Sequence, residues 1–226
     1  MKTYIKNLVF YFLLISLLFG FKPDSIALAG SLLSHRALYE IKINKDNLSN
    51  FQRIVQADGS VVIEMNDVCE KGWATGQKIN VTLTDMNGSE VNSEVNIIGL
   101  ESKDGKEYEF DFVSRFNGSI TAKYVGSADR NEKSGGVSYS IPSGKHSLLP
   151  SNIIFPMNHL VMLIEAAIAG KRTLNRIVFD GGSYDGSFEV NALIGTRKNG
   201  SKKFNFSTKN LEAYTLDFID KNYWPI

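Results

Sequence analysis

Hydrophobic and polar residues alternate with a period of two along most of the chain. In residues 37–43, Leu38 and Glu40 fall on one face of an extended segment, whereas Tyr39, Ile41 and Ile43 fall on the other. This alternation is typical of half-buried β-strands. The same pattern predicts strands at residues 61–65, 79–83, 91–100, 108–112, 119–125, 175–180, 188–194, 203–206 and 211–219.

Asp-Gly and Asn-Gly pairs separate the predicted strands. Two-residue hairpin turns favour these pairs, because both of their residues tolerate the positive φ that such turns require. The pairs are Asp58-Gly59, Asn87-Gly88, Asp104-Gly105 and Asn117-Gly118. With the strands, they predict an antiparallel meander.

The period changes once, and the new period predicts an α-helix at about residues 157–169. Asn158 is the expected N-terminal cap, and Gly170 suits a left-handed C-terminal cap. One helix and about a dozen strands predict a mainly β fold, in which the helix covers a curled, barrel-like antiparallel sheet. The apolar stripe of the helix is expected to contain Leu160, Leu163, Ile164, Ala167 and Ile168.

The N-terminal segment has the composition of a secretory signal peptide. Lys2 and Lys6 precede an uncharged run at residues 7–21, and Ala27-Leu28-Ala29 matches the A-x-A pattern recognised by signal peptidase. A membrane anchor is the alternative, but a spanning helix needs about 20 apolar residues and this run is shorter. We therefore expect a signal peptide at residues 1–29 and a single β-rich domain, soluble after cleavage, at residues 30–226.

Charge and cysteine content limit the partners. The chain has 25 basic and 24 acidic residues without a block of like charge, whereas nucleic acid and anionic membrane surfaces attract clustered Lys and Arg. We therefore expect no nucleic-acid partner. Cys69 is the single cysteine, so a free thiol or a covalent dimer through Cys69 is expected instead of an internal disulfide.

No combination of residues predicts catalysis. Gly182-Ser183 follows a predicted strand but lacks the second glycine of a G-x-S-x-G nucleophile elbow, so we interpret it as a loop. None of the three histidines, His35, His146 and His159, has metal-ligand spacing to another. We interpret His159 as a partly buried, locally hydrogen-bonded side chain and Glu165 as solvated or paired with a nearby base. No cofactor, metal or enzymatic activity is expected.

Three motifs occur in order along the chain after the predicted signal peptide. Residues 34–39 read Ser-His-Arg-Ala-Leu-Tyr, residues 67–73 form a Cys-x-x-Gly-aromatic segment, and residues 155–171 cover the predicted helix. From His35 to Pro225, their order and spacing resemble the EipB-type cell-envelope integrity proteins of alphaproteobacteria. The motif residues that we single out are His35, Arg36, Tyr39, Cys69, Gly72, Trp73, Pro156, His159, Glu165 and Gly170.

The resemblance implies a non-enzymatic periplasmic protein, built as a spiralled sheet with one helix, that supports envelope integrity. Its expected partner is a lipid, a lipoprotein or another envelope protein, and a monomer is expected. The resemblance also implies a disulfide from Cys69 to a second cysteine near the C-terminus. This chain has no second cysteine, so either the product is shortened or the bridge has been lost. A structural docking module and a hydrolase of envelope polymers are the alternative functions.

Overall fold

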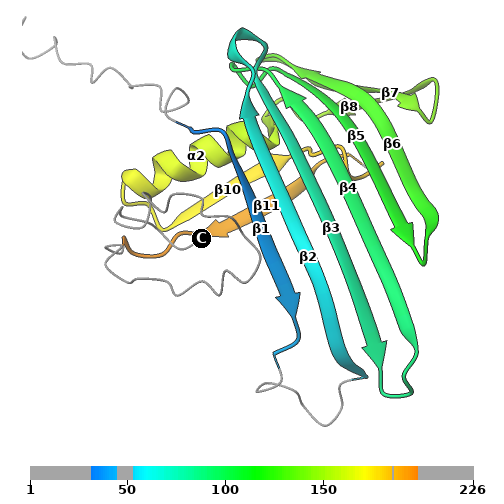
Figure 1. The fold of residues 1–226 in the computed structure, drawn as a ribbon. Coiled ribbons are helices and arrows are strands. Elements are labelled where there is room, and N and C mark those ends of the chain that lie inside the picture. The colour runs from blue at the N-terminus through cyan, green and yellow to red at the C-terminus, as the bar shows by residue number, and fades with distance from the viewer. Residues whose placement is uncertain (1–31, 45–52, 185, 198–226) are drawn as a thin grey trace, which may run out of the picture. The chain divides into compact units, whose positions relative to one another are not determined.

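Eight strands form one antiparallel sheet, in which each strand pairs with the next in the sequence (Figure 1). The structure, a computed structural model, describes residues 32–44, 53–184 and 186–197. The predicted signal peptide and the predicted strands at 203–206 and 211–219 lie outside the described residues. The eight strands are β1 (His35–Lys42), β2 (Ile54–Asp67), β3 (Trp73–Asp85), β4 (Glu90–Glu101), β5 (Glu107–Phe116), β6 (Ser119–Arg130), β7 (Gly135–Ile141) and β8 (Lys145–Leu149).

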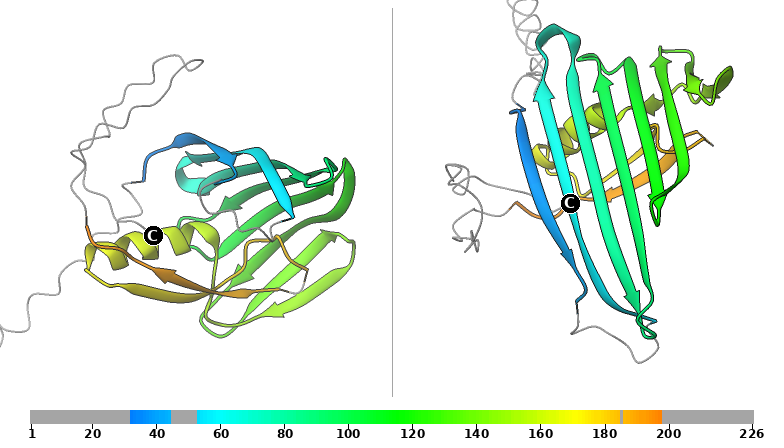
Figure 2. Two further views of the ribbon diagram at one scale, coloured as in Figure 1. Left: turned by 90° about the horizontal axis from the view of Figure 1, so that it is seen from below. Right: turned by 45° about the vertical axis from the view of Figure 1, so that its right-hand side comes forward.

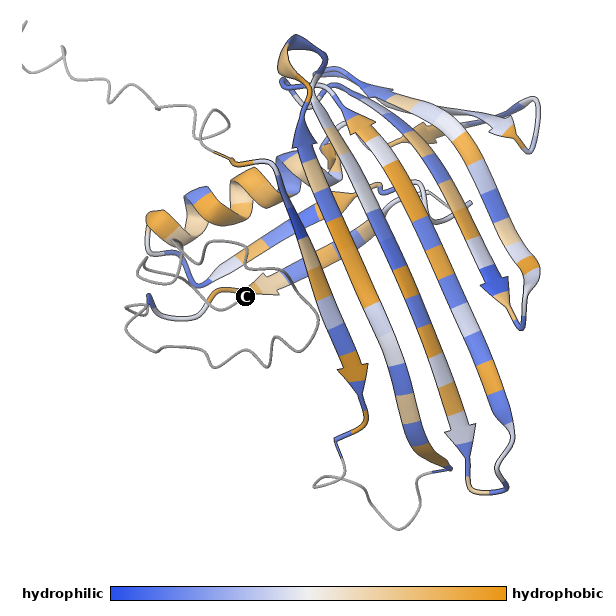
Figure 3. Cartoon of the chain, viewed as in Figure 1, coloured by the Kyte–Doolittle hydropathy of each residue, from blue (hydrophilic) through white to orange (hydrophobic). Residues whose placement is uncertain are grey.

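The alternation of the sequence appears as hydrophobic and hydrophilic bands along these strands (Figure 3). We call the face that carries the buried side chains of Tyr108 and Phe110 the inner face, and its reverse the outer face. Strand register sets Trp73 opposite Glu101, and Glu101 opposite Tyr108. These three side chains therefore lie in one row across the inner face.

Three of the four predicted turns are confirmed. Asn117 and Gly118 join β5 to β6 with φ values of 49° and 77°, which are the positive values of a type I′ hairpin turn. Asn87-Gly88 lies between β3 and β4, and Asp104-Gly105 lies between β4 and β5. The meander from β3 to β6 follows from these local signals.

The turn predicted at Asp58-Gly59 is wrong, because both residues lie inside the long strand β2. Gly59 pairs with Ile41 of β1 and with Val81 of β3. A Cβ atom at Gly59 would lie 2.3 Å from the backbone oxygen of Asn80. The close approach of β3 therefore explains the glycine. In a sequence, such a glycine looks the same as one that is required by a turn.

A second, three-stranded sheet and the predicted helix follow the meander. The strands are β9 (Ile153–Ile154), β10 (Thr173–Val178) and β11 (Phe188–Leu193), and the helix is α2 (Pro156–Ile168). β11 pairs with β10 in antiparallel fashion, but β9 and β10 are parallel because α2 makes the crossover between them. The curled antiparallel sheet and the helix confirm the predicted fold class. The short parallel pair of β9 and β10 was not predicted.

The helix α2 and the second sheet lie over one face of the large sheet (Figure 2), and the core lies between them and the inner face. The side chains of Ile153, Phe155 and Phe179 have 0% exposure and pack against Tyr108 and Phe110 of β5. The ring centroids of Phe110 and Phe179 lie 5.4 Å apart in an edge-to-face arrangement. Burial of these aromatic rings is the main physical reason why the second sheet packs on the first.

The apolar stripe of α2 is confirmed only in part. Leu163 and Ala167 are buried against Leu174 and Ile194, but Ile168 is 54% exposed. Met157 and Ala166 complete the buried face. The packed side of α2 is therefore displaced from the predicted stripe, because the contacting residues belong to β10 and to the segment that follows β11.

Of the two caps predicted for α2, the C-terminal one is confirmed and the N-terminal one is wrong. Gly170 has a φ of 72°, and the N–H groups of Gly170 and Lys171 donate to the carbonyls of Ala167 and Ala166, so the glycine C-cap is confirmed. The predicted cap at Asn158 is wrong, because the N-cap position is Phe155, whose side chain makes no capping hydrogen bond. Pro156 occupies the first helical position, which its fixed φ favours.

Candidate functional site

A pocket of about 360 Å³ lies between the inner face and α2, and we call it the inner pocket. Strands β2 to β4 form one wall, α2 forms a second, and the end of β10 with β11 forms a third. Strand alternation turns Ile63, Met65 and Ile97 towards this space, because they share the face of Tyr108. Its other apolar lining residues are Pro156, Met157, Leu160, Val178, Phe188 and Val190.

Three of the motif residues meet at the inner pocket. His35, Pro156 and His159 all line it, although His35 and the helix are far apart in the sequence. Arg36 and Tyr39 are exposed on β1, where the side chain of Tyr39 is 54% exposed. Glu165 is exposed on α2, and Gly170 ends that helix, so neither of them lines the pocket.

The polar groups at the inner pocket contact mainly backbone. The Tyr108 hydroxyl donates to the carbonyl of Asp180 over 3.1 Å, and the Asp180 carboxylate accepts from the N–H of Gly182. A ring nitrogen of His35 lies 2.9 Å from the carbonyl oxygen of Leu33. Burial raises the pKa of the Tyr108 phenol far above its usual range. In these hydrogen bonds, no two side chains are paired as an acid and a base.

His159 differs from its predicted state. Its side chain is partly buried, as expected, but Nε2 is buried and has no hydrogen-bond partner among the described residues. Burial and the nearby Arg176 lower the pKa of this imidazole, so the ring is neutral at pH 7. Within the described part of the chain, the local hydrogen bond predicted for this side chain is therefore not found at Nε2.

Glu101 is the functional candidate that the sequence analysis missed. Its side chain is 2% exposed at the end of β4, and its two carboxylate oxygens accept the N–H groups of Met157 (2.6 Å) and Asn158 (2.7 Å). Helices leave their first N–H groups without intrahelical partners. Glu101 therefore caps α2 from the large sheet, in place of the absent N-cap side chain. The sequence gives one indication of this role. Glu101 follows Ile97 and Gly99 at every second position, so its carboxylate is expected on the same face of the strand as these two residues.

Opposing effects act on the Glu101 carboxyl. Burial raises its pKa to about 7, although the N–H groups of Met157 and Asn158 and the positive charge of Arg130 lower it. Arg130 is held in place by hydrogen bonds to the carbonyls of Gly105 and Ile153, both at 2.7 Å. The carboxyl thus titrates near neutral pH.

Residues of the Cys-x-x-Gly-aromatic motif contact the end of β4, close to Glu101. Lys103 Nζ lies 3.4 Å from the ring centroid of the buried Trp73 and 2.7 Å from a carboxylate oxygen of Asp67. Gly72 has a φ of 130°, and a Cβ atom there would lie 2.0 Å from the carbonyl oxygen of Glu101. Gly72 thus permits the close approach of the β2–β3 connection to the end of β4. Cys69, in the short η3 helix (Cys69–Lys71), is exposed and free.

A serine–histidine contact also occurs on the outer face. Ser138 Oγ of β7 lies 2.9 Å from His146 Nδ1 of β8, and the two residues are cross-strand neighbours. Among the described hydrogen bonds, no carboxylate orients the imidazole. A nucleophilic serine needs a base that is itself oriented and a site that stabilises an oxyanion. We interpret this exposed contact as a cross-strand pair that stabilises β7 and β8.

Within the described ranges, no three His, Cys, Asp or Glu residues are grouped so that they could hold a metal ion. No described helix has the length and apolar character needed to cross a membrane.

Comparisons with known proteins agree with this architecture. A solved structure of a beta-barrel-like protein of domain of unknown function DUF1849, from Brucella abortus, is similar with a TM-score of 0.72 and 19% sequence identity. The similarity covers 86% of this chain and 77% of the Brucella chain, and it shows a shared fold. Among curated proteins, no match is found.

The sequence profile of the EipB-like family matches residues 26–226, which contain all the motif residues singled out above. The match spans most of the chain, and the Brucella structure shares the fold. The chain therefore belongs to the EipB-like family.

Proposed function

We propose that this protein is a non-enzymatic, periplasmic binding protein that supports the cell envelope by holding an apolar chain, such as the acyl chain of a lipid or lipoprotein, in the inner pocket. The observation that carries this proposal is the lining of the pocket, in which aliphatic side chains from three walls surround about 360 Å³. Ligand pockets are mainly apolar clefts of roughly 300–1,000 Å³ with few polar groups.

Two polar groups that line the pocket favour an uncharged ligand segment. His159 is neutral at pH 7 because burial lowers its pKa, and Tyr108 remains protonated because burial raises its pKa. Burying an unpaired charge among such groups is unfavourable. An acyl chain satisfies this condition, and its polar end would remain at the edge near the exposed His35.

Binding of a fluorescent fatty acid tests this proposal. Ile97 and Ile98 are adjacent on β4 but point to opposite faces, because Ile97 pairs with Phe112 and Ile98 with Asp111. We expect Ile97→Trp to fill the inner pocket and weaken binding of cis-parinaric acid by about tenfold or more. Ile98→Trp is the matched control, and it should leave this binding unchanged.

Val190→Phe fills the same pocket from β11 and replaces Ile97→Trp if that variant does not fold. Native mass spectrometry of protein purified from its own envelope should also show a bound lipid. If the wild-type protein binds no fatty acid and carries no lipid, the proposed function is wrong. Equal binding by the wild-type protein and both filling variants would also contradict it.

The proposed location has its own test. Residues 1–31 lie outside the described residues, so export rests on the sequence pattern. N-terminal sequencing of the protein from a periplasmic extract should give Gly30 as the first residue. Full-length protein that starts at Met1 and remains with the inner membrane would contradict this location.

A further inference from the structure

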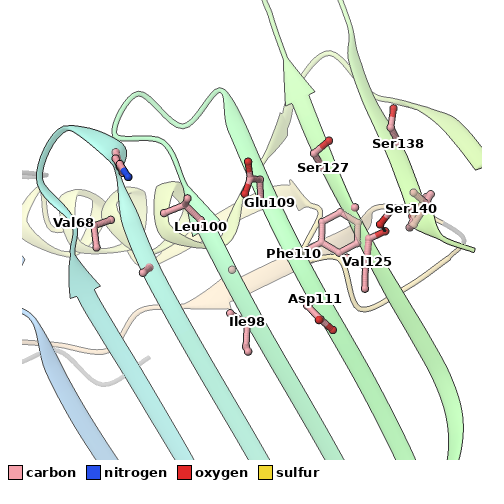
Figure 4. A pocket seen from close by; sticks show the side chains of 15 residues that line it. Val68, Ile98, Leu100, Glu109, Phe110, Asp111, Val125, Ser127, Ser138 and Ser140 are labelled. Carbon is pink, nitrogen blue, oxygen red and sulfur yellow. Dashed lines mark hydrogen bonds between the residues drawn. The ribbon is translucent and has the colours of Figure 1, made fainter. Parts of the chain in front are cut away.

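A second hollow, of about 760 Å³, lies on the outer face of the large sheet, and we call it the outer hollow (Figure 4). Its floor is formed by outward-facing residues of β4, β5 and β6. Leu100, Glu109 and Ser127 are cross-strand neighbours, and so are Ile98, Asp111 and Val125. Val68 and Lys71 flank the hollow on one side, and Ser138 and Ser140 flank it on the other.

Small side chains create this hollow. The outward-facing neighbours of Leu100 and Ile98 on β3 are Ala74 and Gly76. A Cβ atom at Gly76 would meet nothing within 4 Å, so the space above it is open. The hollow therefore results from the sequence of β3 and from the serines of β6 and β7, and not from a break in the sheet.

The floor exposes apolar surface to solvent. Ile98 lies near the middle of the large sheet and is 54% exposed. Leu100 and Val125 line the same hollow and are partly exposed. Exposed apolar side chains beside polar groups offer hydrophobic contacts to a bound segment.

Two carboxylates line the hollow, those of Glu109 and Asp111. Neither has an ion-pair partner among the described residues. Elsewhere on the outer face, the Glu94 carboxylate is paired with both Lys78 and Arg115. One oxygen of Asp111, Oδ1, is buried and has no hydrogen-bond partner in the described part of the chain. An unpartnered buried oxygen is unfavourable, so a donor from outside would stabilise it.

Two further carboxylates lie next to the hollow on the outer face. Glu107 and Asp129 stand directly opposite each other on β5 and β6, an arrangement that destabilises a strand pair. Among the described residues, Lys71 is the one cation that lines the hollow, and no described ion pair joins it to Glu109 or Asp111. The residues that line the hollow thus carry two carboxylates and one cation, a balance that favours basic groups over anionic lipid headgroups.

We propose that the outer hollow docks an extended, basic polypeptide segment of another envelope protein. Alternate residues of an extended chain lie roughly 6.6 Å apart, as do Glu109 and Asp111 on β5. A segment with Lys or Arg at every second position therefore sets two basic groups over these two carboxylates. The methylene stems of these basic side chains then contact Ile98, Leu100 and Val125, because the intervening residues of an extended chain point away from the floor. This surface is separate from the inner pocket, and so is its ligand.

A synthetic peptide of alternating Lys and Val, labelled with fluorescein, tests this proposal by fluorescence anisotropy with the full chain. We expect binding that weakens with added salt, and no binding of the matching Glu–Val peptide. The double variant Glu109→Gln, Asp111→Asn should weaken binding by about tenfold or more, and so should Ile98→Ser. Glu90→Gln, at the other end of β4, is the control and should bind as the wild-type protein does.

Cys69 allows the bound peptide to be located. It lies in η3 between Val68 and Lys71, both of which line the hollow, and its thiol is exposed and free. Benzophenone attached to Cys69 should crosslink the Lys–Val peptide in the wild-type protein and not in the Glu109→Gln, Asp111→Asn variant.

Four results of the peptide and vesicle binding experiments would overturn the proposal. These are no binding at about 1 mM peptide, equal binding of the Glu–Val peptide, undiminished binding by the double variant, or binding of anionic phosphatidylglycerol vesicles through the same residues. A crosslink from Cys69 into residues 198–226 of its own chain, with exclusion of the peptide, would show that the chain itself occupies the hollow. That result would also overturn it.

Discussion

Glu101, at the end of β4, accepts the backbone N–H of Met157 in the first turn of α2 over 2.6 Å. The donor and the acceptor are 56 residues apart in the sequence, and the carboxylate is 2% exposed. One side chain of the large sheet therefore determines where the helix begins. Because Met157 and Leu160 also line the inner pocket, this contact fixes one wall of the proposed binding site.

Glu101→Ala is expected to lower the free energy of unfolding by about 2–4 kcal/mol. It leaves the buried N–H groups of Met157 and Asn158 without acceptors, and each such group costs about 1–3 kcal/mol. Urea denaturation followed by circular dichroism measures the change. Glu165→Ala is the control, because Glu165 is exposed on the same helix and should change stability by about 0.5 kcal/mol or less. Equal effects of the two variants would contradict the capping role.

The contribution of Glu101 to stability should depend on pH. Its pKa is about 7 in the folded protein and 4.5 when unperturbed, so folding favours the protonated carboxyl. The contribution is therefore largest below pH 4.5 and declines as pH rises to about 7. His159 acts in the opposite direction, because its lowered pKa makes protonation below about pH 6.5 destabilising.

Comparison with Glu101→Gln separates these two groups, since the variant retains His159. We expect the free energy of unfolding of the wild-type protein, minus that of Glu101→Gln, to be smaller at pH 8 than at pH 5. The decrease should be a few kcal/mol at most, since each pKa unit corresponds to about 1.4 kcal/mol. Urea unfolding at both pH values measures it. A difference that rises with pH would show that Glu101 is fully ionised in the folded state.

Leu163→Ala should destabilise the protein by about 2–5 kcal/mol, because it leaves a cavity among buried side chains. Leu163 is 8% exposed and packs with Leu174 and Ile194. Ile168→Ala on the same helix is the control, since Ile168 is 54% exposed and should cost less than about 1 kcal/mol. Thermal unfolding compares the two. If Leu163→Ala has no effect, α2 is not packed against β10.

Gly72→Ala and Gly76→Ala should differ strongly. Gly72 has a φ of 130° and no room for a Cβ atom, because the carbonyl oxygen of Glu101 would lie 2.0 Å away. We expect a loss of about 2 kcal/mol or more. Gly76 has open space, so Gly76→Ala should change stability by about 1 kcal/mol or less. Similar unfolding midpoints for the two variants would show that the β2–β3 connection does not approach β4 as described.

The thiol of Cys69 should react in the folded protein without denaturant, because it is exposed and free. A thiol-reactive dye and mass spectrometry measure its labelling, and non-reducing gels report any covalent dimer. Labelling that requires both reductant and denaturant would contradict this prediction. It would also remove the basis for attaching a crosslinker at Cys69.

The strands, the helix and most turns could be predicted because their signals are local. A period of two places alternate side chains on one face whatever the strand pairs with, and Asn117-Gly118 adopts positive φ values through its own residue types. Gly170 ended the helix as predicted for the same reason. The mainly β fold with one helix follows from these signals and from the resemblance to EipB-type proteins.

Long-range contacts decided the rest. Gly59 carries the same local signal as a turn glycine, yet the approach of Asn80 from a neighbouring strand explains it. Asn158 is a better cap than Phe155 by residue type, but a carboxylate from β4 lies close enough to accept the first N–H groups. The tertiary structure also brought His35 and His159 to one pocket and placed Ile97 and Ile98 on two different sites. Local periodicity determines which side chains share a face, but only the packing of distant strands and α2 determines what each face meets.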